Sequence, residues 1–180
     1  LQSDGNHGEL YPKSTEFSET GIPYLSAANI DLNTSTIDFT SSKYLPINKA
    51  KIFKKGIAKD GDILLAHNAT VGPTVMLSTH YPFVVLSTTL TLFRINQSKM
   101  NPIFFLYTLR SVQFQQALKK MMKQTTRNQV PILTQRNIDV SYPNNIDEQA
   151  NLGIFFKQLD GTIALHQRQS DNYKELKKSM

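Results

Sequence analysis

Two groups of lysines supply the side chains of this sequence that are best suited to binding a polyanion. Lysine anchors phosphate groups as a point charge, and clustered lysines release condensed counterions when they meet a phosphate backbone. We therefore expect both groups to contact phosphates. They comprise Lys49, Lys51, Lys54 and Lys55 in the first segment, and Lys119, Lys120 and Lys123 in the second. Ordinary solubilising surface charge is the alternative interpretation of the same residues.

A polar loop directly after the second lysine group carries side chains that can distinguish bases. Arg127 can bind guanine through two hydrogen bonds, and Asn128 or Gln129 can bind adenine in the same way. Asn68 and Thr70, in an earlier polar segment, are the next candidates. Phosphate anchoring and base reading would then be divided between the lysines and these five residues. Because any polar loop contains such residues, composition alone leaves base reading a hypothesis.

The sequence lacks the patterns of the common catalytic and metal centres. Its four histidines, at positions 7, 67, 80 and 166, are too scattered for a metal-binding spacing, and neither a nucleophile elbow nor a glycine-rich phosphate loop occurs. We expect His67 to form hydrogen bonds within a loop. Asn101-Pro102-Ile103-Phe104 is similar to the motif with which amino-methyltransferases hold a flipped base, but Ile103 replaces the second proline, and a helix start fits better. We predict no catalytic residue, metal or cofactor.

Length and charge suggest one domain with an appendage. The 180 residues contain no cysteine, no apolar run of membrane-spanning length and no signal peptide, so we expect a cytoplasmic protein. Lys and Arg outnumber Asp and Glu by 15 to 9 through residue 145 and are balanced at 5 to 5 afterwards, so the +6 excess lies in the first part. The sequence begins at Leu1 and stops inside a helical pattern, which suggests a fragment.

The apolar patterns predict an α+β fold. We expect a compact mixed domain with twisted, largely antiparallel strands and a packed helix, followed by a long C-terminal helix of coiled-coil type. Residues 1–21 are interpreted as loop and turn. Strands are predicted at 22–25, 62–66 and 84–95, with a break at 67–73 after the second, and one helix at 101–123 that begins at the cap Asn101.

The C-terminal helix should follow Asp147, which we predict to be its cap, and should carry an apolar seam. The seam residues alternate four and three positions apart, the spacing of a helix that packs against another helix. They are Leu152, Phe156, Leu159, Ile163 and Tyr173. We expect a second long helix to cover this seam, and the alternative is that the helix packs on its own domain.

The order of several short motifs resembles type I restriction-modification specificity subunits. The motifs are Gly21–Ser26, Asn29–Ile30, Lys55–Gly56, Asp60–Leu65, Ala69–Gly72, Thr125–Pro131, Tyr142–Pro143, Glu148–Gln149, Phe155–Ile163, Leu165–Gln169 and Leu176–Lys178. The match covers almost the whole chain, although Gln124 stands where the family often has glycine. The usual subunit has two such halves and this chain has one. We also expect the family's N-terminal entry to the recognition domain to be missing or trimmed before Leu1.

The resemblance implies a division of labour. Residues 1–145 would form a target-recognition domain that reads one part of a split site in double-stranded DNA. Residues 146–180 would form a conserved helix that pairs with a second specificity half, or with a second copy of the chain. That helix would also contact the methyltransferase (M) subunits and, through the complex, the restriction (R) subunits. The resemblance implies neither enzyme activity nor a cofactor.

Two other functions fit the residues. One is a helical adaptor whose basic domain binds DNA without sequence preference, or binds an acidic protein. The other is the detached recognition domain of a single-chain DNA methyltransferase, which would not need the long neutral helix.

Overall fold

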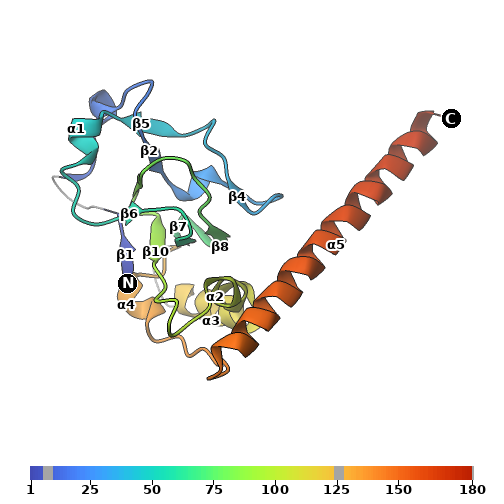
Figure 1. The fold of residues 1–180 in the computed structure, drawn as a ribbon. Coiled ribbons are helices and arrows are strands. Elements are labelled where there is room, and N and C mark those ends of the chain that lie inside the picture. Colours follow the sequence, from blue (N-terminus) through green and yellow to red (C-terminus); the bar gives the residue numbers. More distant parts are fainter. Residues whose placement is uncertain (6–9, 124–127, 180) are drawn as a thin grey trace.

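Two four-stranded sheets form the centre of the mixed domain in the computed structural model, which describes residues 1–5, 10–123 and 128–179 (Figure 1). The first sheet is entirely antiparallel, and its order is β1 (Gln2–Asp4), β10 (Leu90–Phe93), β7 (Ile63–Asn68) and β8 (Thr70–Met76). The second has the order β5 (Lys43–Leu45), β2 (Ile22–Leu25), β9 (Val84–Leu86) and β6 (Ile57–Ala58), and only its β2–β9 pair is parallel. A small hairpin joins β3 (Ile30–Asp31) and β4 (Thr36–Ile37).

Helices surround these sheets. The short helices are α1 (Ile47–Ala50) and α4 (Ile132–Gln135), with 3-10 turns η2 (Ser14–Glu16) and η3 (Ala27–Asn29). The longer ones are α2 (Pro102–Arg110), α3 (Val112–Met122) and α5 (Ile146–Ser179). Figure 1 shows α5 running away from the mixed domain after its first turns. The predicted fold class, a mixed α+β domain with mostly antiparallel strands and a long C-terminal helix, is confirmed.

Strand β7 explains how the layers stack, because both of its faces are apolar. Leu64 and Ala66 pack with residues of the second sheet, including Leu86. Ile63 and Leu65 face the other way and pack with α2 and α3. The first sheet is therefore buried between the second sheet and the helices, which is why this strand has a continuous apolar run.

Two predicted elements are each divided in the structure. The expected strand at 84–95 is β9 and β10, which lie in different sheets. Both strands are buried, so their composition gives no sign of the change from one sheet to the other. The expected helix at 101–123 is α2 and α3. Ser111 has an extended backbone, with ψ 149°, and its Oγ accepts a hydrogen bond from the Phe114 N–H, so it ends one helix and caps the next. The predicted cap Asn101 is confirmed, since its Oδ1 accepts from Ile103 and Phe104.

Three smaller expectations were wrong. Part of the expected loop 1–21 is strand β1. Backbone hydrogen bonds to β10 hold this strand, so it needs no apolar side chains and its polar sequence does not reveal it. The expected break at 67–73 is a hairpin between β7 and β8. Helix α5 is capped by Asn145, whose Oδ1 accepts a 2.7 Å hydrogen bond from the Asp147 N–H, so Asp147 lies in the first turn.

Candidate nucleic-acid interface

The hairpin of β7 and β8 ends in a tight, exposed tip. Asn68 pairs with Thr70 across Ala69, whose φ of 65° places it in the left-handed region that non-glycine residues rarely adopt. Near the tip β8 carries an extra residue, and the bulge uses Gly72, at φ 116°, and Pro73, which has no N–H to pair. The bulge increases the local twist at the end of the hairpin, where Thr70 is exposed and Asn68 is half-buried.

A second segment lies against this tip. The Ala69 N–H donates a 2.9 Å hydrogen bond to the carbonyl of Asn128, and the Val130 N–H donates a 2.8 Å bond to the carbonyl of His67. Between them, Asn68 and Gln129 form an antiparallel bridge. The structure thus brings together four of the five predicted base-reading residues, Asn68, Thr70, Asn128 and Gln129, which we call the tip cluster. The fifth, Arg127, lies outside the described residues.

A buried network of polar side chains connects the two segments of the tip cluster to the first sheet. The Nδ1 of His67 lies 2.9 Å from the hydroxyl of Thr91, which also accepts a 2.9 Å hydrogen bond from the side-chain amide of Gln135. The same amide donates to the carbonyl of Val130 at 2.7 Å. His67 therefore forms hydrogen bonds as expected, but from a buried strand position. Gln135, which no motif singles out, ties the segment after Asn128 to the sheet.

Helix α3 carries the second lysine group beside the tip. Its apolar side, with Phe114 and Leu118 buried, packs on the first sheet, so Lys119 and Lys120 are directed to solvent. Lys123 follows the last turn and is also exposed. The side-chain amide of Gln115 donates a 2.9 Å hydrogen bond to the carbonyl of Gly72, which fixes α3 to the bulge in β8. Phosphate-binding and base-reading candidates therefore lie on one side of the domain.

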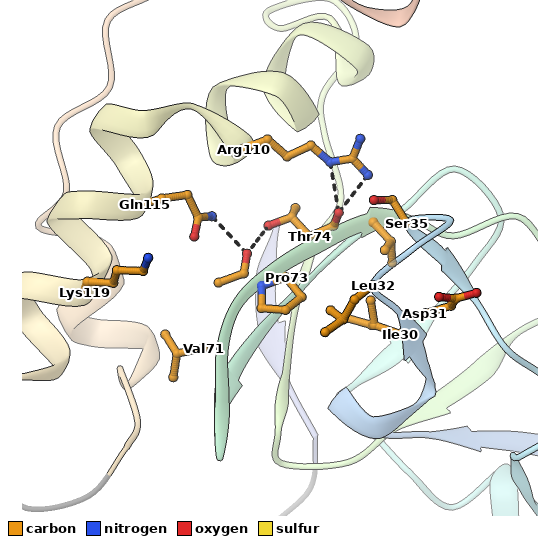
Figure 2. Close-up of a pocket in the computed structure, with 12 residues that line it drawn as sticks. Ile30, Asp31, Leu32, Ser35, Val71, Pro73, Thr74, Arg110, Gln115 and Lys119 are labelled. Atoms are coloured by element: carbon orange, nitrogen blue, oxygen red, sulfur yellow. Dashed lines mark hydrogen bonds between the residues drawn. The ribbon is translucent and has the colours of Figure 1, made fainter. Parts of the chain in front are cut away.

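A pocket of about 310 Å³ opens next to this surface, between α3, β8 and the β3–β4 hairpin (Figure 2). Lys119, Gln115 and Arg110 line it from the helices, and Asp31 and Leu32 line it from the hairpin. Hydrogen bonds from the backbone N–H of Asn33 and from Thr34 lower the pKa of Asp31, so this wall stays anionic at neutral pH. No motif in the sequence indicates this pocket, because residues 31–40 are rich in Thr and Ser and predict only an irregular connection.

The first lysine group lies elsewhere, around α1, which Figure 1 shows at the end of the mixed domain far from α2 and α3. Two of its members are paired with carboxylates: Lys49 with Glu16 at 2.6 Å, and Lys55 with Asp4 at 3.1 Å. The hydrogen bond from Lys49 lowers the pKa of Glu16. Lys51 and Lys54 are exposed. The structure does not bring this group to the tip cluster, and its role in phosphate binding stays a prediction.

The predicted seam of α5 divides into two parts. The face that packs on α2 comprises Gln149, Gly153, Phe156 and Asp160: Gln149 accepts from the Asn101 N–H at 2.9 Å, and a Cβ on Gly153 would meet the Phe104 nitrogen. Phe156 stacks on Tyr107 with ring centroids 5.5 Å apart, so it belongs to this internal contact. Leu152, half-buried, borders it. Leu159, Ile163 and Tyr173 are 45, 59 and 68% exposed.

The described residues hold neither a metal cluster nor a membrane-spanning helix. Within residues 1–5, 10–123 and 128–179, no group of three or more His, Asp or Glu side chains is arranged to hold a metal ion. None of the helices in the same part of the chain combines the length and apolar character needed to cross a membrane.

Comparison with known proteins gives one family. The model of the type I restriction modification DNA specificity domain matches residues 4–174. No curated protein sequence matches the chain.

Three solved structures share the fold. The HsdS subunit from Thermoanaerobacter tengcongensis has a TM-score of 0.67 at 18% identity, over 92% of this chain and 36% of that one. A chain from work on complex assembly and conformational transition of the type I R-M system has a TM-score of 0.67 at 17% identity, over 98% and 40%. The type I restriction-modification S subunit from M. genitalium has a TM-score of 0.59 at 17% identity, over 94% and 38%. This chain thus spans well under half the length of each.

Proposed function

Since the chain belongs to the family of type I restriction-modification DNA specificity domains, we propose that it acts as a partial specificity subunit that reads one part of a split DNA site. Members of this family are non-catalytic specificity subunits, so no chemical step is assigned to it. The observation that carries the proposal is the tip cluster beside the lysines of α3: Asn68, Thr70, Asn128 and Gln129 meet there. Thr70 and Asn128 are exposed, and Asn68 and Gln129 are half-buried.

Residues 1–145 would bind double-stranded DNA in the cytoplasm. The tip of a two-stranded hairpin is narrow enough to enter the major groove, where each base pair presents its own pattern of donors and acceptors. Asn68, Asn128 and Gln129 carry amides that can pair with adenine, and Thr70 carries a hydroxyl that can pair with several bases. Lys119, Lys120 and Lys123 would hold the flanking phosphates and set the register, and Arg127 remains a candidate reader of guanine.

Residues 146–180 would connect the reading domain to the other subunits. Leu159, Ile163 and Tyr173 are exposed on one side of α5 and would pack against the helix of a second specificity half or a second copy. A second set of exposed apolar residues lies along another side of α5, with about three helical turns between one residue and the next. This line comprises Ile154, Leu165 and Leu176. This line is suited to an M subunit, through which R subunits would join the complex.

Binding to a pool of duplexes with a randomised segment tests the reading function. The unmodified chain should enrich a short motif, and Asn68→Ala with Gln129→Ala should relax preference at one or two base pairs, by roughly 1 to 3 kcal/mol for each good bidentate pair that is removed. Asn48→Ala, at an exposed position on α1, is the control and should keep the motif.

Enrichment of no motif by the unmodified chain would contradict the proposal. It would instead support the nonspecific adaptor. If the motif is enriched and the double variant retains it in full, base reading lies outside the tip cluster.

A further inference from the structure

Arg110, the last residue of α2, contacts two other parts of the fold as well as a neighbour in its own helix. Its Nε and Nη2 donate hydrogen bonds of 3.1 and 2.9 Å to the carbonyl of Thr74 in β8, as Figure 2 shows. Its Nη1 lies 3.6 Å from Oδ2 of Asp160 in α5. Its guanidinium also lies over the ring of Tyr107, at 5.7 Å from the centroid. One side chain therefore joins the hairpin that carries the tip cluster to the long helix.

Tyr107 strengthens the same connection. Its hydroxyl donates a 2.8 Å hydrogen bond to Oδ2 of Asp160, and its ring packs on Phe156. Burial, and then the hydrogen bond to Asp160, raise the pKa of Tyr107 to about 12, so the hydroxyl keeps its proton at physiological pH and remains a donor. Asp160 is thus held by two groups from α2.

Asp160, through its contacts with Tyr107 and Arg110, is the residue of this group that lies farthest along α5. Residues 161–178 are exposed on every side. At 1.5 Å per residue, this exposed part is about 27 Å long, so a tilt of roughly 10° at its base would move its end by about 5 Å. That displacement exceeds the rise of one DNA base pair, about 3.4 Å.

We propose that Arg110 is a positioning residue that, with Tyr107 and Asp160, fixes the tilt of α5 relative to the β7–β8 hairpin and so sets the spacer length accepted between the two parts of a split site. The inference rests on the proposed function. Arg110 acts through α5 and reads no base itself. Removing its link to Asp160 should leave recognition of a single half-site intact while the spacing between half-sites becomes less strictly defined.

Distance measurements between two spin labels test the tilt directly. The chain has no cysteine, so Glu19→Cys and Gln169→Cys, both at exposed positions, place one label on the mixed domain and one on the exposed part of α5. Labelled chains diluted with excess unlabelled chain would report distances within one molecule. We expect Arg110→Met and Asp160→Ala to broaden or shift the distance distribution. Arg168→Met, farther along α5, is the control and should not change it.

Asp160 is about half exposed, so its variant is expected to fold even if the Arg110 variant does not, and thermal unfolding of each variant checks this. Distributions that coincide with the unmodified chain in both folded variants would overturn the positioning role. They would show that Gln149 and Gly153 at the base of α5 fix the tilt without Arg110.

Sequencing of methylated bases in host DNA tests the consequence. With Arg110→Met, methylation at sites whose spacer is one base pair longer or shorter should rise several-fold, while the sequence of each half-site is unchanged. An unchanged spacer preference would overturn the spacing role even if the label distances broaden. If the unmodified gene supports no split-site methylation at all, the proposed function fails, whereas the label distances still report separately on the contact of Arg110 with Asp160.

Discussion

The two lysine groups differ in how available they are for DNA. Lys119 and Lys120 are exposed on α3, whereas Lys49 and Lys55 around α1 are each within 3.1 Å of a carboxylate. A lysine that already has an ionic partner gains less from a phosphate, because the existing ion pair must be broken or shared. We therefore expect the first lysine group to contribute less per residue to phosphate binding than the second.

The salt dependence of DNA binding should separate the two groups. Lys119→Ala with Lys120→Ala should weaken binding to all sequences alike and reduce the slope of log affinity against log salt by about 0.9 for each phosphate that is no longer neutralised. The matched pair Lys177→Ala with Lys178→Ala, also exposed but on α5, should leave the slope unchanged. A slope that does not respond to the α3 pair would remove this helix from the interface.

The buried hydroxyl of Thr91 gives a prediction on stability. Thr91→Val keeps the shape of the side chain but leaves His67 and the amide of Gln135 without this partner, which should lower the free energy of unfolding by about 1 to 3 kcal/mol. The variant should also lose sequence preference, because the segment at Asn128 and Gln129 is less firmly held. Urea unfolding measures the first effect. Thr20→Val at an exposed position is the control, and equal stability of both variants would show that the network is not important.

At the scale of elements, local patterns in the sequence predicted what is buried better than where an element ends. The apolar run at 62–66 and the cap Asn101 were predicted correctly, because burial and capping leave their signal within a few residues. Strand 84–95 was predicted as one element since both β9 and β10 are buried, and no local rule reveals that the chain passes from one sheet to another. The turn at Ala69 was missed because it has no glycine at the left-handed position.

The candidate site shows the same division between local and long-range information. Residue type alone selected the members of the tip cluster, since amides and hydroxyls are the groups that read bases. Their meeting depends on bonds between segments far apart in the chain, such as that from Ala69 to Asn128, which a single sequence does not reveal. The same holds for Arg110: its contacts with Thr74 and Asp160 exist only once three elements have packed.

At the scale of the molecule, the exposed seam of α5 requires a partner. Leu159→Glu with Ile163→Glu would bury two unpaired carboxylates in the interface between the paired helices. Their burial should cost several kcal/mol of association free energy, which such an interface should not tolerate. We expect the unmodified chain to sediment as a dimer, or in complex with a second half, and the double variant as a monomer with its mixed domain folded. The pair Gln158→Glu with Gln169→Glu adds the same charge on a different side of α5 from the seam, so it should leave this helix pairing intact.

Monomeric unmodified chain at high concentration, together with normal assembly of the seam variant with M subunits, would contradict this role of α5. The helix would then be only an appendage of its own domain.

The whole molecule, in our proposal, determines one part of a split DNA site for a methylating complex. Sequencing of methylated bases in host DNA, with the gene intact, deleted, or carrying Asn68→Ala and Gln129→Ala, tests this most directly. We predict that deletion abolishes methylation of one motif made of two short parts separated by a fixed spacer, and that the double variant alters the bases read by this chain while the spacer stays the same. An identical methylation pattern in the presence and absence of the gene, or disappearance of a motif that is continuous, would contradict it.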